Sequence, residues 1–176
     1  MLTQDYFELF GVEPGFEIDA ERLMHRYREL QKVLHPDRYV NASDQERHLA
    51  MQQAAQVNDG YQTLKDPLSR ARYLLTQRGI EEAPEQATIR DVDFLEEQME
   101  LRETLAEIRS DADPQGSIFH FLAALNAKEK AYISQLSAAF AEADEAALNE
   151  AGALVQRLRF VRRLQQEAEA IEEELL

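Results

Sequence analysis

The side chains best suited to acid–base or metal chemistry in this 176-residue chain are four histidines and 34 acidic residues. The histidines, His25, His35, His48 and His120, are far apart in the sequence. None forms a His-Glu-x-x-His pair, and the glutamate-rich segments lack the Glu-x-x-His repeats of a di-iron bundle. The chain has no cysteine and no glycine-rich phosphate loop, so we predict no metal site and no cofactor. A metal-dependent enzyme is a weak alternative, and it would require stoichiometric metal in the purified protein.

One histidine belongs to a short motif with a definite local geometry, His35-Pro36-Asp37. A histidine in the last helical turn interacts favourably with the helix dipole, proline ends the helix, and aspartate favours a turn. The tripeptide alone therefore predicts only a helix end. Its surroundings are basic, which makes it a candidate functional site. The basic residues are Arg22, Arg26, Arg28 and Lys32 on the preceding helix, and Arg38 directly after the motif.

The elements that must position this motif are helical. Amphipathic periodicity runs through almost every segment and strand-like alternation is absent, so we predict an all-α protein. A short helix is expected at residues 5–10, a second from Asp19 to the proline, and a third from the capping box that begins at Ser43. Facing apolar stripes and a short polar loop at residues 38–42 predict that the second and third helices form an antiparallel hairpin with the motif at its tip.

Charge divides the chain into two modules. Residues 1–78 contain 10 Lys and Arg against 12 Asp and Glu, whereas residues 79–176 contain 9 against 22. We place a linker at residues 79–87, a short acidic stretch that contains a proline. Residues 88–176 have three long helical patterns, at about 91–110, 114–141 and 144–175, and short connections between them predict a three-helix bundle.

The net charge of −15 also excludes several classes of partner. Nucleic acids and anionic membranes are bound by basic surfaces, so neither is an expected partner of the acidic second module. No apolar run approaches the roughly 20 residues of a membrane span, and the first residues do not have the pattern of a signal peptide. We expect a cytoplasmic protein whose second module binds another protein.

The helix that begins at Asp91 has apolar residues on two sides. Its core stripe is predicted to consist of Phe94, Leu101, Leu105 and Ile108. Leu95 and Met99 lie roughly a third of a turn away from that stripe, on the flank that should face solvent. The glutamates beside them are Glu96, Glu100, Glu103 and Glu107. An apolar pair with a polar rim is typical of a partner surface, although the pair could also widen the core stripe.

Phe160 is a second apolar residue outside a core stripe. It follows Leu158 on the last helix but lies on neither its side nor that of Val161, within a run of four arginines. An aromatic ring among arginines indicates a cation-π contact or a binding role.

The N-terminal module resembles the J domain. The resemblance rests on Asp5-Tyr-Phe-Glu-Leu-Phe-Gly11, on Tyr27-Arg28 and on His35-Pro36-Asp37-Arg38. It implies that the chain stimulates ATP hydrolysis by a chaperone of the seventy-kilodalton heat-shock class. The basic face and Tyr27 would dock on an acidic surface of that chaperone, and the tripeptide would trigger hydrolysis. One departure is Asn58-Asp59-Gly60, where the family usually has a helix former, which predicts a locally weaker third helix because glycine costs about 1 kcal/mol relative to alanine.

The C-terminal module is similar to the bundle of the HscB family of J-domain co-chaperones. The similar segments are TIRDVDFLEEQMELRE at 88–103 and VQRLRFV at 155–161. The resemblance implies that the bundle binds an IscU-type iron-sulfur scaffold protein and presents it to an HscA-type chaperone. The binding positions that it implies are Leu95, Met99, Glu100, Glu103, Glu107 and Phe160, with Glu96 where an apolar residue is expected. The remaining alternative is a J-domain adaptor for a different client.

Overall fold

We describe residues 5–82 and 91–176 of a computed structural model. Their helices divide into two compact units, Met1–Leu74 and Leu75–Leu176. Within the described residues every regular element is helical, which confirms the predicted all-α class. The linker predicted at residues 79–87 lies partly outside the described residues, and that boundary stays a prediction. No helix in the described ranges is long and apolar enough to cross a membrane.

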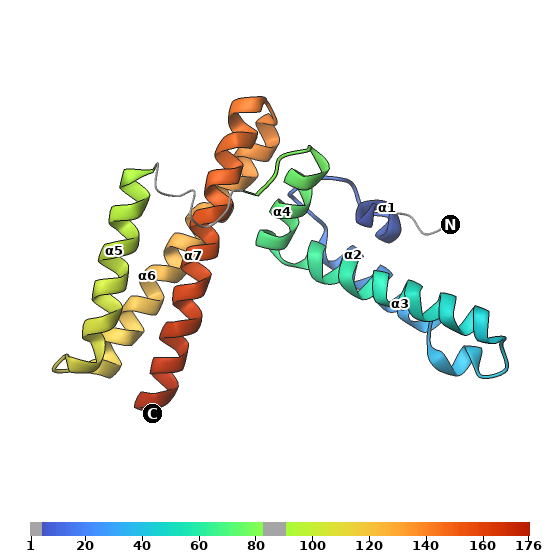
Figure 1. Cartoon of the computed structure of the whole chain (residues 1–176), viewed down its shortest axis with the longest axis horizontal. Coiled ribbons are helices and arrows are strands. Elements are labelled where there is room, and N and C mark those ends of the chain that lie inside the picture. Colours follow the sequence, from blue (N-terminus) through green and yellow to red (C-terminus); the bar gives the residue numbers. More distant parts are fainter. Residues whose placement is uncertain (1–4, 83–90) are drawn as a thin grey trace. The chain divides into compact units, whose positions relative to one another are not determined.

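The first unit is built on a helical hairpin (Figure 1). Helix α2 (Ala20–Val33) runs antiparallel to α3 (Asp44–Lys65), and a single 3₁₀ turn, η1 (Pro36–Tyr39), lies at the tip where the sequence predicted an irregular loop. The predicted starts are confirmed. The side chain of Asp19 caps α2, and Ser43 and Glu46 form a complete capping box at the start of α3.

Two further helices complete the first unit. Helix α1 (Tyr6–Phe10) is capped by Asp5 and ends at Gly11, which has the left-handed conformation that glycine adopts at little cost. Helix α4 (Pro67–Gln77) follows α3. The side chains with the least exposed surface in this unit are Phe7, Phe10, Leu23, Leu64 and Ala71, so each of its four α-helices contributes at least one to its centre.

The Asn58-Asp59-Gly60 stretch does not interrupt α3, which continues for 22 residues. Gly60 is buried, and a Cβ atom placed there would lie 2.8 Å from a ring carbon of Tyr6 and 3.0 Å from one of Phe10. The glycine is therefore the position at which α1 packs directly on the backbone of α3. The expected weakness is offset by this contact, which no larger residue would allow without movement of α1.

The second unit contains the predicted three-helix bundle. Its helices are α5 (Val92–Glu107), α6 (Pro114–Glu142) and α7 (Glu145–Leu175), and the turn η3 (Ile108–Ser110) follows α5. Their N-caps are Asp91, Asp113 and Asp144, each of which accepts a hydrogen bond from a backbone N–H of the first turn.

Helices α6 and α7 form the main pair of the bundle, and α5 lies along them (Figure 1). The completely buried side chains of this pair include Leu125, Leu136, Leu158 and Leu164. By contrast, α5 buries only Phe94 and Leu105, and Ile108 follows in η3. The shorter helix is therefore the most weakly anchored of the three.

Candidate interaction surfaces

The His35-Pro36-Asp37 motif forms the exposed tip of the hairpin. His35 is the N-cap of η1, and its Nδ1 accepts a hydrogen bond from the backbone N–H of Asp37 at 3.3 Å. The same Nδ1 lies 3.5 Å from a carboxylate oxygen of Asp37. The side chains of His35 and Asp37 are 59% and 87% exposed. The cap fixes the backbone of the motif while its side chains stay accessible to a partner.

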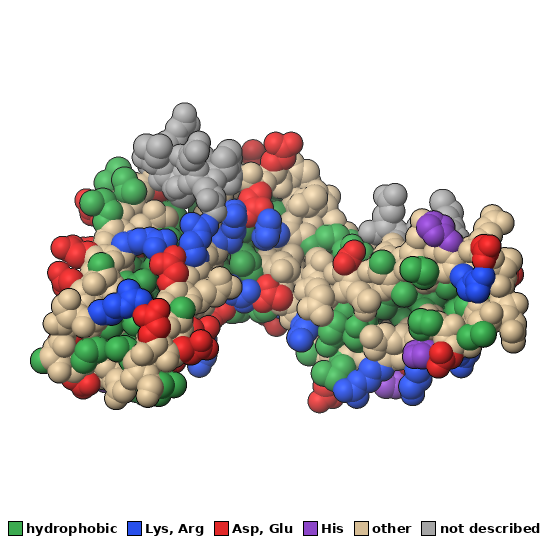
Figure 2. Space-filling model, turned by 60° about the horizontal axis from the view of Figure 1, so that its bottom comes forward, with side chains coloured by type: hydrophobic (Ala, Val, Ile, Leu, Met, Phe, Trp, Pro, Cys, Tyr) green, Lys and Arg blue, Asp and Glu red, His purple; other side chains and the backbone are tan. Residues whose placement is uncertain are grey.

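The solvent side of α2 is basic, as the sequence predicted. Arg22, Arg28 and Lys32 are exposed, as is Arg38 after the motif. Arg26 is half-buried and pairs with Glu29 at 2.7 Å. The pKa of Glu29 is lowered, first by this hydrogen bond and then by the nearby charges of His25, Arg26 and Lys32. Lys, Arg and His side chains gather along one edge of this unit in Figure 2. The exposed Arg38 directly follows the motif in the sequence, so the motif adjoins basic side chains.

Tyr27 lies between the hairpin helices and not on the open basic face. Its ring stacks on Tyr61 with the centroids 4.0 Å apart and the planes 6° from parallel. Its hydroxyl donates to Asn58 at 2.7 Å and accepts from Gln31 at 2.7 Å. Tyr27 therefore fixes α2 against α3, and its predicted contact with a chaperone stays a prediction.

The outward face of α5 combines apolar and acidic side chains. Leu95 and Met99 are 38% and 65% exposed, so they do not widen the core stripe. Val92 is 61% exposed and lies three residues before Leu95, on the same side of the helix. Val92 was not predicted as part of this surface, although its spacing from Leu95 and Met99 is the signal that could have identified it.

Four glutamates line this apolar strip. All are exposed, and no cation pairs with any of them within residues 5–82 and 91–176; they are Glu96, Glu100, Glu103 and Glu107. At about 100° per residue they occupy the side of α5 adjacent to Val92 and Met99. The helix thus presents an apolar strip beside an acidic one, and Glu96 directly follows Leu95 in the sequence. We call this surface, Val92, Leu95, Met99 and the four glutamates, the α5 face.

Phe160 is not part of an exposed surface. Its side chain is only 7% exposed, and its ring packs edge-on against Phe94 with the centroids 5.9 Å apart. The guanidinium of Arg102 lies over the same ring at 5.7 Å. The expectation that Phe160 lies outside the core was wrong, because α5 covers a side of α7 that periodicity within α7 alone assigns to solvent. Its role in scaffold binding stays a prediction. The geometry favours an indirect role, in which Phe160 packs against the inner side of α5.

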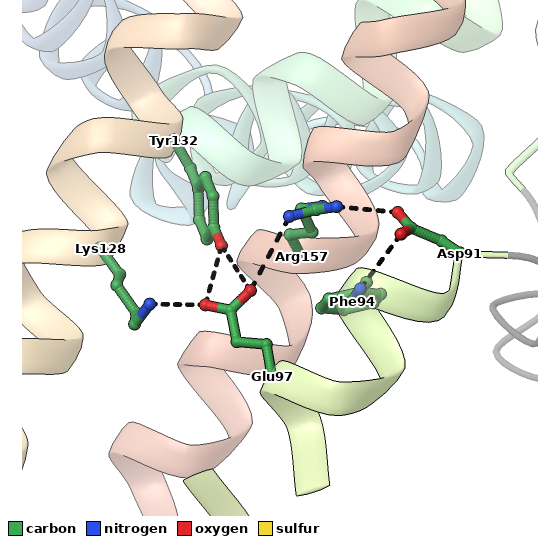
Figure 3. Close-up of polar contacts among 6 residues, drawn as sticks. All are labelled: Asp91, Phe94, Glu97, Lys128, Tyr132 and Arg157. Atoms are coloured by element: carbon green, nitrogen blue, oxygen red, sulfur yellow. Dashed lines mark hydrogen bonds and ion pairs between the residues drawn. The ribbon is translucent and has the colours of Figure 1, made fainter. Parts of the chain in front are cut away.

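A polar cluster joins the three helices beneath the α5 face (Figure 3). The carboxylate of Glu97 on α5 accepts from Lys128 of α6 at 2.5 Å and lies 3.4 Å from the hydroxyl of Tyr132. Arg157 of α7 lies 3.8 Å from Glu97 and pairs with Asp91 at 2.8 Å. We call these five residues the Glu97 cluster.

The surroundings of the Glu97 cluster shift several pKa values. The pKa of Lys128 is raised, chiefly by its hydrogen bond to Glu97, and that of Tyr132 is raised by burial and by the same carboxylate. The pKa of Asp91 is lowered, first by the backbone N–H of Phe94 and next by Arg157. These shifts result from the contacts of the cluster, and they widen the pH range over which the Lys128 ammonium and the Asp91 carboxylate stay charged.

The fold and the motif together define a class of protein. The chain matches the family model of the DnaJ domain over residues 5–73, which covers the hairpin, its exposed His35-Pro36-Asp37 tip and most of α4. The first unit is a J domain, and a J domain followed by a separate helical unit is the organisation of a J-domain co-chaperone.

The second unit identifies the family. Residues 90–169 match the model described as the HSCB C-terminal oligomerisation domain. The co-chaperone protein HscB homolog of Shewanella denitrificans is 46% identical over 172 residues, which are 98% of this chain and 99% of that protein. The chain therefore belongs to the HscB family of co-chaperones.

Solved structures of the family have the same fold. Chaperone HscB from Vibrio cholerae superposes with a TM-score of 0.87 at 42% identity, over 98% of this chain and all of that one. The human co-chaperone protein HscB gives a TM-score of 0.87 at 31% identity, over 97% of this chain and 83% of that one. The resemblance predicted from the sequence is confirmed over nearly the whole chain.

Proposed function

We propose that this co-chaperone stimulates the ATPase of an HscA-type heat-shock chaperone and delivers an IscU-type iron-sulfur scaffold protein to it, assisting the maturation of iron-sulfur proteins. The J domain acts on the chaperone through the tripeptide and the basic face of α2. The bundle holds the scaffold through the α5 face. The protein regulates its partner's hydrolysis and performs no covalent chemistry itself.

The observation that carries this proposal is that the two units present accessible surfaces of different kinds. The tip of the J domain presents an exposed His35 and Asp37 beside basic side chains, with a net charge of +3 between Arg22 and Arg38. Such a surface favours encounter with an acidic partner. The α5 face has exposed apolar anchors with an acidic rim, which is the composition of a protein interface.

The test is the ATPase rate of an HscA-type chaperone, measured with the co-chaperone and with or without an IscU-type scaffold. We expect His35→Gln to abolish the stimulation, whereas His120→Gln, the same change at an exposed histidine of α6, should leave it intact. Unchanged stimulation by the His35→Gln variant would refute the J-domain half of the proposal.

The proposal that the bundle binds the scaffold protein is tested by measuring scaffold affinity. Replacement of both Leu95 and Met99 by serine should weaken binding by more than about tenfold, because central apolar anchors contribute most of the free energy of an interface. Phe119→Ser is the matched control, since Phe119 is 63% exposed on α6. Equal losses in the two variants would contradict a specific role for the α5 face.

The second candidate function is a J-domain adaptor for a different client. The observation in its favour is Glu96, an exposed charge beside the apolar strip, where the family resemblance leads one to expect an apolar residue. Scaffold binding that survives the double serine replacement, together with continued stimulation of the chaperone, would favour this candidate.

A further inference from the structure

The turn of α5 that carries Leu95 and Met99 has unusually little apolar anchorage. Phe94 and Leu105 are the two buried side chains of α5, and no side chain between them is fully buried. The inward positions of this stretch are taken by Glu97, Gln98 and Leu101, all of which are half-buried. The central part of α5 therefore adds polar contacts with the main helix pair to the apolar contacts of the buried Phe94 and Leu105.

Glu97 supplies the strongest of these contacts. It lies midway in sequence between Leu95 and Met99, and two residues correspond to a rotation that places it about 160° from each around the helix. While those side chains point outward, the Glu97 carboxylate contacts Lys128 and Tyr132 of α6 and Arg157 of α7. Its side chain is 21% exposed, so these charges interact more strongly than pairs on the open surface.

We propose that Glu97 is a positioning residue for the client-binding face: its contacts with α6 and α7 hold the central turns of α5 in place and so fix the spacing of the apolar anchors. This inference rests on the proposed function of the α5 face. Glu97 itself faces away from the client. It acts by ordering α5 before the client binds, so that less conformational entropy is lost on binding.

The other contacts of α5 do not replace this one. Arg102 pairs with Glu167 at 2.8 Å, and Arg109 of the following turn η3 pairs with Glu174 at 2.6 Å, but in both pairs each side chain is more than two-fifths exposed. Exposed pairs contribute little because water screens them. Arg157 fixes the start of α5 through Asp91. Within residues 5–82 and 91–176, the cross-helix ion pairs between the buried Phe94 and Arg102 are those of Glu97.

The experiment compares Glu97→Gln, Lys128→Met and the double variant in the full chain. We expect amide hydrogen exchange across residues 95–101 to accelerate by about fivefold or more in each single variant, the factor for one lost hydrogen bond. Affinity for an IscU-type scaffold should fall by a similar factor. The double variant should be no worse than either single one, because residues in one network are not additive.

Glu169→Gln is the matched control, since it removes the same charge from an exposed position of α7. Far-UV circular dichroism and the thermal midpoint establish that each variant is folded at the temperature of the binding measurement. A purely structural role would lower the midpoint without changing either exchange in residues 95–101 or scaffold affinity at that temperature, and this result would overturn the proposal.

The outcome separates this inference from the function on which it rests. If the unchanged chain does not bind the scaffold, the proposed function fails, and the exchange measurement still decides whether Glu97 orders α5. If the chain binds and the Lys128→Met variant binds equally well with unchanged exchange, the positioning role of Glu97 is refuted and the function stands.

Discussion

At the scale of single residues, each of the two ring nitrogens of His35 has its own role: one caps η1 and the other is available to a partner. Its Nδ1 accepts the backbone N–H of Asp37 and so caps η1. A nitrogen that accepts a hydrogen bond carries no proton, so the neutral ring has its proton on Nε2. The exposed histidine therefore offers a chaperone an N–H donor whose direction is fixed by the cap.

This division predicts different results for two substitutions of His35. Asparagine is a strong N-cap, and its shorter side chain can replace Nδ1 but cannot reach the position of Nε2. We expect His35→Asn to keep the amide chemical shift of Asp37 near its original value and yet to lower chaperone stimulation by at least about fivefold, the factor for one hydrogen bond of about 1 kcal/mol. Stimulation that returns in His35→Asn but not in His35→Gln would show that the cap alone is required.

At the scale of elements, the middle of α3 is a junction that fixes two other helices. Asn58 accepts the hydroxyl of Tyr27 from α2, and Tyr61 stacks on the same ring. One residue away from Tyr61, Gly60 admits the rings of Tyr6 and Phe10 from α1. A stretch that looks unfavourable for a helix in isolation is therefore favourable in the assembled J domain, because each residue contacts a different neighbour.

Gly60→Ala tests this junction. Alanine is better than glycine within a helix by about 1 kcal/mol, but its Cβ would lie 2.8 Å from Tyr6. Overpacking costs about 1 to 3 kcal/mol, so we expect faster amide exchange in α1 and α3 and a net loss of stability. In the control, Gly152→Ala, no atom lies within 4 Å of the new Cβ, and α7 should gain stability. A gain at both positions would contradict close packing at Gly60.

At the scale of the whole molecule, acidic charge is the dominant property, with a formal net charge of −15. Some of the carboxylates that carry this charge also stabilise the fold through hydrogen bonds. The pKa values of Glu29, Asp91 and Asp111 are all lowered, chiefly by hydrogen bonds from Arg26, from the Phe94 backbone and from Ser117 respectively. A lowered pKa in the folded state means that the unfolded chain binds protons more readily, so acid favours unfolding.

The direction of the Asp91 pKa shift determines the pH range over which this residue stabilises the fold. The stabilisation from Asp91 is fully present above its ordinary pKa of 3.8 and is lost as the pH falls through the lower folded-state value. We expect Asp91→Asn to be less stable than the unchanged chain at pH 7 and to lose less stability below about pH 4, as measured by urea denaturation across the pH range. Asp93→Asn, at an exposed neighbour, controls for the loss of one charge. If the free energy of unfolding fell equally steeply below about pH 4 in Asp91→Asn and in the unchanged chain, this account would be contradicted.

Features that depend on residues close together in the chain could be predicted from the sequence. The starts of α2, α3 and α5 were predicted at Asp19, Ser43 and Asp91, because a cap is completed by side chains and backbone groups within four residues. Helical periodicity fixes which residues share a side of a helix. It therefore also predicted the hairpin with its tripeptide tip and the outward position of Leu95 and Met99.

Which helical faces are covered and which carboxylates are paired depends on how the helices pack against one another, and neither could be predicted from the sequence. Phe160 belongs to the core because α5 packs over it, and Glu97 differs from Glu96 and Glu100 because Lys128 and Arg157 come within reach of it alone. Lys128 and Arg157 are 31 and 60 residues from Glu97 in the sequence. Periodicity assigns a residue to a side of its own helix, but the burial and charge pairing of that side depend on which other helix lies against it.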